Sequence, residues 1–106
     1  MTISWSKNGA EARCNVGGEL DLATEPRVRR ELLDALRDAP TRLTIDLGDV
    51  TFIDSTGLRA LLSARNRASS IGTRVVLARL APAVERTLAI ANLWSFFEFE
   101  AEPRPT

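Results

Sequence analysis

The chain has 106 residues, of which 44% are hydrophobic and 26% charged, values typical of one soluble globular domain. Fourteen basic residues balance fourteen acidic ones, which argues against nucleic acid as the main partner because phosphate binding needs a basic surplus. No run approaches the ~20 apolar residues that cross a bilayer, and the N-terminus lacks the shape of a signal peptide. We therefore expect one cytoplasmic domain over 1–106, without a membrane partner and with a frayed tail over about 102–106.

Side chains suited to catalysis are scarce. Histidine is absent, which removes the Ser-His-Asp triad, the usual general base and histidine metal ligands. Lys7, the single lysine, lies in the N-terminal turn, and no glycine-rich nucleotide loop is present. Cys14, the single cysteine, is interpreted as a buried small hydrophobe in a strand. We expect no enzyme activity, no metal site and no cofactor.

The first half of the chain predicts a hairpin and a helix. Strands are expected over Ile3–Ser6 and Glu11–Val16 around the turn signal Asn8-Gly9, and Gly17-Gly18 is expected to break the second strand. A helix should follow, with Thr24 as its N-cap, Pro26 in its first turn and its end near Arg37.

Alternating apolar residues predict the clearest strand. Leu43, Ile45 and Leu47 alternate with Thr44 and Asp46, which is the period of a strand with one better-buried face. The chain should then turn at Gly48-Asp49. The next apolar residues, expected to anchor the chain in the core, are Val50, Phe52 and Ile53.

The second half predicts two more helix and strand pairs. Ser55 opens a helix to about Ser69, stopped near Gly72, and Val75–Ala78 reads as a strand covered on both faces. Pro82 marks a third helix, with Asn92 as its C-terminal cap. Its expected inner face comprises Val84, Leu88 and Ala91.

Phe96, Phe97 and Phe99 predict a final short strand or packed tail. Together with Trp5 and Trp94 they are interpreted as core or sheet-edge packing, and a homodimer through that edge is left open. The resulting order, β-β-α-β-α-β-α-β, predicts an α/β fold. We expect a mixed sheet with an N-terminal antiparallel pair, then right-handed parallel β-α-β units, with helices packed on the sheet.

The segment most suggestive of function runs from Asp46 to Leu58. A strand ends, a short loop follows, and a helix begins at Ser55 and Thr56, directly after Asp54. A helix N-terminus offers unpaired N–H groups and partial positive charge, so it can hold a phosphate. Helix capping and a modification site both fit this pattern, and the two are not exclusive.

The run Phe52-Ile53-Asp54-Ser55-Thr56-Gly57-Leu58, preceded by Asp46-Leu47-Gly48-Asp49-Val50, resembles the signature of STAS domains, above all bacterial anti-sigma factor antagonists. Weaker similarity covers nearly the whole chain. It includes Gly18–Thr24, Gly72–Leu77 and Pro82–Phe97. The resemblance implies the STAS fold, with helices mainly on one side of the sheet.

The resemblance also implies a partner-switching role. The implied phosphorylation site is Ser55, with Thr56 as second choice. The implied partners are an anti-sigma factor of the serine-kinase (GHKL) type, which holds a sigma factor, and a PP2C-type phosphatase. The implied partner-binding residues are Asp21, Asp54, Ser55, Thr56, Gly57, Leu58 and Arg59.

One alternative shares the same fold. Other STAS proteins act as non-catalytic subunits of lipid-transport ABC systems or as stress-signalling scaffolds. In that case Thr56 and the second helix would form a permanent docking surface without phosphate turnover.

Overall fold

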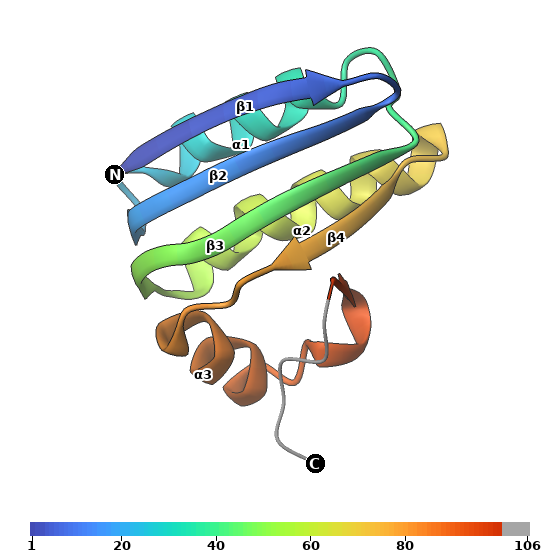
Figure 1. The fold of residues 1–106 in the computed structure, drawn as a ribbon. Coiled ribbons are helices and arrows are strands. Elements are labelled where there is room, and N and C mark those ends of the chain that lie inside the picture. The colour runs from blue at the N-terminus through green and yellow to red at the C-terminus, as the bar shows by residue number, and fades with distance from the viewer. Residues whose placement is uncertain (101–106) are drawn as a thin grey trace.

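The computed structural model describes residues 1–100 (Figure 1). Its elements are β1 (Thr2–Asn8), β2 (Glu11–Leu20), α1 (Glu25–Ala35), β3 (Arg42–Ile53), α2 (Ser55–Ile71), β4 (Arg74–Ala78), α3 (Pro82–Ile90), the 3-10 turn η1 (Trp94–Phe96) and β5 (Glu98–Phe99). This is the predicted order of strands and helices. The predicted frayed tail over 102–106 lies outside the described residues.

The strands form one five-stranded sheet in the order β1-β2-β3-β4-β5. The β1–β2 pair is antiparallel, and all later pairs are parallel. Helices α1 and α2 cover one face of this sheet, while α3 lies beyond the β4 side (Figure 1). The predicted mixed sheet with helices mainly on one side is confirmed.

The core fills the space between the sheet and helices α1 and α2. The strand alternation predicted it correctly, because Leu43, Ile45 and Leu47 are all fully buried. The helices contribute apolar residues at helical spacing, which present one face to the sheet. The fully or almost fully buried apolar residues of α1 and α2 are Val28, Leu32, Ala35, Leu58, Ala60, Leu61, Ala64 and Ala68, and Val84 and Leu88 of α3 are fully buried as predicted.

Both central strands are longer than the sequence suggested. Gly17-Gly18 does not break β2, and Gly48-Asp49 does not turn the chain, since β2 continues to Leu20 and β3 to Ile53. Register shifts on either side of this stretch absorb the irregular residues, so the β2–β3 pairing resumes after them. The two strands therefore extend to the start of α2.

Helix α1 begins differently from the prediction. Thr24 occupies the N-cap position, but its side chain makes no capping hydrogen bond to the helix. Its hydroxyl instead donates to the Glu19 carbonyl at 2.7 Å and accepts from the Asp21 N–H at 3.0 Å. The helix ends at Ala35, two residues before the predicted Arg37.

A residue in the left-handed conformation follows each of the other two helices. Helix α2 reaches Ile71, two residues beyond the prediction, and stops at Gly72 with φ +78°. After α3 the C-cap is Ala91, one residue before the predicted Asn92; Asn92 follows it with φ +58°, and the Leu93 N–H bonds the Leu88 carbonyl at 2.9 Å. Ala91, expected on the inner face, is exposed because the helix has already ended.

The C-terminal aromatic residues mostly pack, as predicted. Trp94 and Phe99 lie with ring centroids 5.3 Å apart, and Phe97 is buried. Phe96 is 45% exposed, and the Arg65 guanidinium lies over its ring, 5.2 Å from the centroid. Trp5 packs against the core from β1.

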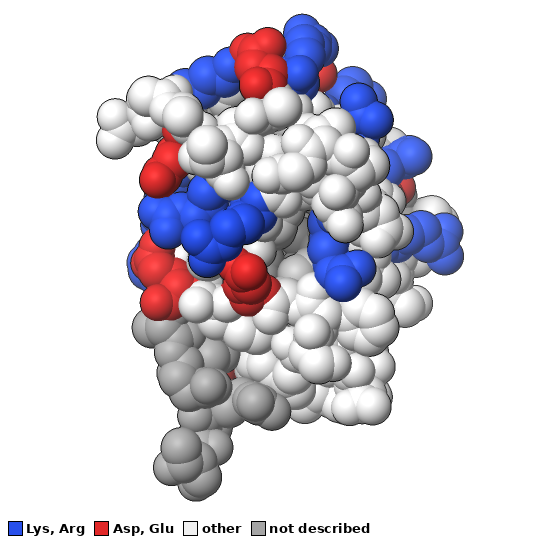
Figure 2. Space-filling model, turned by 90° about the vertical axis from the view of Figure 1, so that its right-hand side faces the viewer, with Lys and Arg blue, Asp and Glu red and all other residues white. Residues whose placement is uncertain are grey.

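Acidic and basic side chains are intermingled on the surface. Figure 2 shows both signs side by side on the side of the molecule that lies at the right in Figure 1. This distribution agrees with the balanced charge of the chain.

Cys14 is fully buried in β2, as predicted. Burial, with a smaller contribution from the Glu31 carboxylate, raises the pKa of its thiol to about 12. Since the thiolate is the reactive form, we expect no reaction with Ellman's reagent at pH 8 in the native protein. One equivalent should react once guanidinium chloride unfolds the chain. Full labelling of the native protein would contradict the buried placement.

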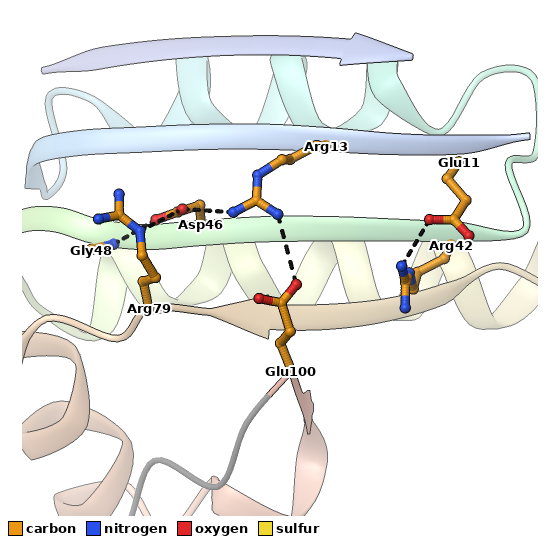
Figure 3. A network of polar contacts seen from close by, with 7 residues as sticks. All are labelled: Glu11, Arg13, Arg42, Asp46, Gly48, Arg79 and Glu100. Atoms are coloured by element: carbon orange, nitrogen blue, oxygen red, sulfur yellow. Dashed lines mark hydrogen bonds and ion pairs between the residues drawn. The ribbon is translucent and has the colours of Figure 1, made fainter. Parts of the chain in front are cut away.

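The sheet face away from α1 and α2 carries a network of ion pairs (Figure 3). Asp46 of β3 is only 4% exposed and bonds Arg13 and Arg79, each at 2.8 Å. Arg13 also lies 3.7 Å from Glu100. The sequence predicted that the side of β3 carrying Thr44 and Asp46 would be the less buried one. At Asp46, the side chains of Arg13 and Arg79 cover it.

The pKa of the Asp46 carboxyl reflects opposing effects. Burial raises it, but hydrogen bonds from Arg79, the Gly48 N–H and Arg13 lower it more, so the pKa lies below its ordinary value. A lowered folded-state pKa stabilises the protein above the unfolded-state pKa of about 3.9. This stabilisation is lost as the pH falls through the folded-state pKa.

Replacing Asp46 with asparagine should lower the free energy of unfolding at pH 7 by about 2 kcal/mol. The loss stays below that of a fully buried pair because the side chains of Arg13 and Arg79 are 42% and 61% exposed. The difference from wild type should shrink below pH 4. Asp34→Asn, which breaks an exposed pair with Arg37, is the control and should cost at most about 0.5 kcal/mol. Urea unfolding at pH 7 and pH 3 measures both, and an equal loss at both pH values would contradict the argument.

Candidate functional site

The first turn of α2 lies against the ends of β2 and β3, at the left in Figure 1. The Asp54 N–H donates to the Leu20 carbonyl at 3.3 Å, which joins the start of α2 to the end of β2. Because β2 and β3 are parallel, their C-terminal ends meet at the same edge of the sheet. The predicted segment around Ser55 and the loop that carries Asp21 therefore lie side by side.

Asp54, not Ser55, caps helix α2. Its carboxylate accepts a hydrogen bond from the Gly57 N–H at 2.9 Å, and its backbone is extended, as the N-cap position requires. Ser55 is the first helical residue. The prediction that the helix opens at Ser55 is confirmed, and the capping that the sequence pattern suggested comes from the preceding Asp54.

Ser55 is consequently free of a structural task. Its side chain is exposed, and within residues 1–100 its hydroxyl has no hydrogen-bond partner. Thr56 is half-buried, and Arg59, one turn further along α2, is exposed. An accessible hydroxyl on a rigid helix terminus is suited to modification or to contact with a partner.

Gly57 allows α2 to approach β2 closely. A Cβ atom at this position would lie 2.2 Å from the Leu20 carbonyl oxygen, a distance that no side chain tolerates. Leu58 is only 4% exposed and belongs to the core. These two predicted partner-binding residues are buried, so the surface of the site comes from their neighbours.

The loop between β2 and α1 is held in a fixed shape. The Asp21 carboxylate accepts from the Ala23 N–H at 3.0 Å and from the Thr24 N–H at 3.2 Å. Together with the Thr24 hydroxyl, which bonds Glu19, these bonds form a tight turn. Asp21 therefore has a structural role in this turn, in addition to its predicted role as a direct partner contact.

Comparison with known proteins identifies this arrangement. The family model described as Mlab, STAS domain, matches residues 3–96. The chain belongs to the STAS domain family. The antiparallel pair, the parallel β-α-β units and the α2 start after Asp54 are thus features of a STAS domain.

Individual relatives of this STAS domain cover almost its full length. It is 29% identical to a STAS-domain containing protein of Pseudomonas aeruginosa over 92% of this chain and 96% of the relative. It is 28% identical to the anti-sigma-B factor antagonist of Bacillus subtilis over 96% and 93% of the two chains. The crystal structure of an anti-sigma factor antagonist from Mycobacterium paratuberculosis superposes with a TM-score of 0.78, at 27% identity over 92% and 83% of the chains.

Two exposed apolar side chains border the site of this STAS domain, and sequence reasoning missed both. Leu22 is 76% exposed in the Asp21 loop, and Phe52, expected to anchor the chain in the core, is 45% exposed near the end of β3. The signal for Leu22 was its place directly after Asp21, a residue that favours turns, and before the helix start. Nothing in the sequence around Phe52, two residues before the cap Asp54, indicated that its side chain is exposed. Exposed large apolar groups beside a polar site are typical of protein contact surfaces.

The remaining features concern metals and membranes. Among residues 1–100, no cluster of three or more histidine, cysteine, aspartate or glutamate side chains is arranged to hold a metal ion. In the same part of the chain, no helix is both long and apolar enough to span a bilayer. The site is a surface of two hydroxyls (the exposed Ser55 and the half-buried Thr56), two carboxylates, an arginine and two apolar side chains.

Proposed function

We propose that this STAS domain is an anti-sigma factor antagonist whose binding is controlled by phosphorylation of Ser55. In the unmodified state it binds an anti-sigma factor of the GHKL serine-kinase type, which releases a sigma factor and regulates transcription. The domain itself contributes binding and no catalysis. The single observation that carries the proposal is the exposed, unbonded Ser55 hydroxyl on the first residue of α2.

The relatives support the partner class. The Bacillus and Mycobacterium proteins are named as anti-sigma factor antagonists, and both match this chain over more than nine-tenths of its length. The contact surface that we propose contains Asp21, Asp54, Ser55, Thr56 and Arg59. Leu22 and Phe52 supply the apolar area that a stable contact needs.

The modification is a simple group transfer. The kinase partner transfers the γ-phosphoryl group of ATP to the Ser55 Oγ, so the bond to ADP breaks, a P–O bond to serine forms, and the hydroxyl proton is released. The product carries about −1.5 to −2 charges at neutral pH. A PP2C-type phosphatase would reverse the step by hydrolysis, returning serine and inorganic phosphate.

The added charge should weaken binding without unfolding the domain. Asp21 and Asp54 already place negative charge around Ser55, and a dianion buried in a closely fitted interface loses its hydration. Within the domain itself the phosphate lies at a helix N-terminus, where negative charge is stabilising. The fold therefore survives while the contact is lost.

Phosphosite mapping tests the site assignment. The domain is incubated with its kinase partner and ATP, and the modified residue is located by tandem mass spectrometry. We expect phosphate on Ser55, or on Thr56 as second choice. Phosphate confined to Ser63 or Ser69, further along α2, would refute the assignment.

Affinity capture tests the partner class and separates the main alternative. Wild-type protein and Ser55→Ala, immobilised and exposed to extract of the native cells, should retain a GHKL-type kinase. Retention of the ATPase subunit of a transport system would instead favour the constitutive-subunit role. In that case Ser55→Asp should retain the same subunit as wild type does.

A further inference from the structure

Arg59 is placed to interact with any charge added at Ser55. The two residues are four apart on α2, both are exposed, and Ser55 is the first residue of the helix. Side chains at this spacing lie on one face with Cβ atoms about 5–6 Å apart. An arginine side chain spans that distance and can bind phosphate oxygens through two parallel N–H donors.

Arg59 has no other electrostatic partner in the described part of the chain. No ion pair or hydrogen bond joins it to another of residues 1–100, in contrast to Arg13, Arg74 and Arg79. The acidic residue nearest to Arg59 along the chain, Asp54, lies five positions before it and accepts a hydrogen bond from the Gly57 N–H. The guanidinium of Arg59 is therefore available to a partner or to a phosphate.

The N-terminal end of α2 carries its negative charge on the cap residue Asp54. No residue within the first turn of α2 is acidic, but the acidic cap Asp54 directly precedes it, and Arg59 lies one residue beyond that turn. A phosphate on Ser55 would add to the negative charge that the Asp54 cap already places at this helix end. It would also place an anion four residues N-terminal to a cation, which is the more favourable order for such a pair.

We propose that Arg59 binds the phosphate on Ser55 in cis, so that phosphorylation both adds a dianion and withdraws Arg59 from the partner surface. This inference rests on the proposed function, because it assigns Arg59 a role in the regulation of the same site. Arg59 is a positioning residue: it holds the phosphate against the first turn of α2. Part of the phosphate charge is then balanced within the domain, where Asp21 and Asp54 would otherwise repel it.

Phosphorus NMR of a protein with phosphoserine genetically encoded at position 55 tests the proposal. The phosphate titration midpoint is measured between pH 4 and pH 8 in the wild-type background and in Arg59→Gln, Arg59→Lys and Arg67→Gln. Arg67 is the matched control. It is another exposed arginine on α2, eight residues further along and thus about 12 Å away along the axis.

We expect Arg59→Gln to raise the phosphate titration midpoint by about 0.3 pH units, since a nearby cation favours the dianion. Arg59→Lys should recover part of this shift, because the charge remains while the paired donors are lost. Arg67→Gln should leave the midpoint unchanged. A midpoint in Arg59→Gln within 0.1 units of the wild-type background, or an equal shift in Arg67→Gln, would overturn the proposal.

The experiment separates this proposal from the proposed function. The phosphate is installed during translation, so the result does not depend on any kinase acting on Ser55. Suppose that Arg59→Gln shows the expected rise in the titration midpoint, but the kinase places no phosphate on Ser55. The proposed regulation by phosphorylation would then be refuted, while the role of Arg59 would stand. Phosphate on Ser55 after incubation with the kinase, with no midpoint shift in Arg59→Gln, would refute only the proposed role of Arg59. Circular dichroism melting of each variant shows that the fold is retained.

Discussion

Replacing Ser55 with aspartate should weaken binding of the anti-sigma factor by at least about 30-fold, or about 2 kcal/mol. Phosphorylated Ser55, with about twice the added charge, should lower the affinity by up to about 1000-fold. Ser55→Ala should bind as wild type does, because the hydroxyl that it removes makes no hydrogen bond within residues 1–100. It should also resist phosphorylation at this position, because alanine has no acceptor oxygen. Isothermal titration calorimetry with the captured partner measures all three.

Two controls separate binding from folding in this series. Ser69→Asp places the same charge on an exposed position near the other end of α2 and should leave the affinity unchanged. The melting temperature of Ser55→Asp should stay within a few degrees of wild type, since an acid in the first helical turn is stabilising. If Ser55→Asp binds as tightly as wild type, the electrostatic switch is refuted.

Replacing Gly57 with alanine is expected to be the most destabilising single substitution in the site. In an ordinary helix this change stabilises by up to about 1 kcal/mol. Here the new Cβ would lie 2.2 Å from the Leu20 carbonyl oxygen and 2.8 Å from the Leu20 Cβ. Since the nearest atom is backbone, α2 has to move away from β2, and we expect a loss of about 3 kcal/mol in the free energy of unfolding.

Urea unfolding measures this loss, with Asn66→Ala as the control. Asn66 lies exposed on α2, so its replacement with the best helix former should be neutral or slightly stabilising. Gly57→Ala should also weaken partner binding, because the displaced helix start carries Ser55. A variant as stable as wild type would show that α2 and β2 are not in close contact.

Local patterns predicted the core and the position of the site well. The alternation of Leu43, Ile45 and Leu47 reflects burial on one face, and each helix repeats apolar residues on the side that meets the sheet. The Asp54-Ser55 step marked the start of α2 because both residues favour helix N-termini. Which of the two caps the helix depends on backbone angles that the residue types do not determine.

Features that depend on distant partners were not predictable. Asp46 looks like a solvated strand residue until Arg13 from β2 and Arg79 from the end of β4, each 33 residues away, close over it. Likewise, Gly17-Gly18 and Gly48-Asp49 are good turn signals in isolation. The β2–β3 pairing overrides both, because a register shift keeps the backbone groups bonded.

The division of tasks between Asp54 and Ser55 has an evolutionary consequence. Because Asp54 supplies the helix cap, the identity of residue 55 is not fixed by capping. A lineage can therefore gain, lose or exchange its regulatory hydroxyl by single nucleotide changes while the scaffold stays intact. Paralogues with independent signalling inputs can thus diverge from one ancestral domain without first acquiring compensating mutations.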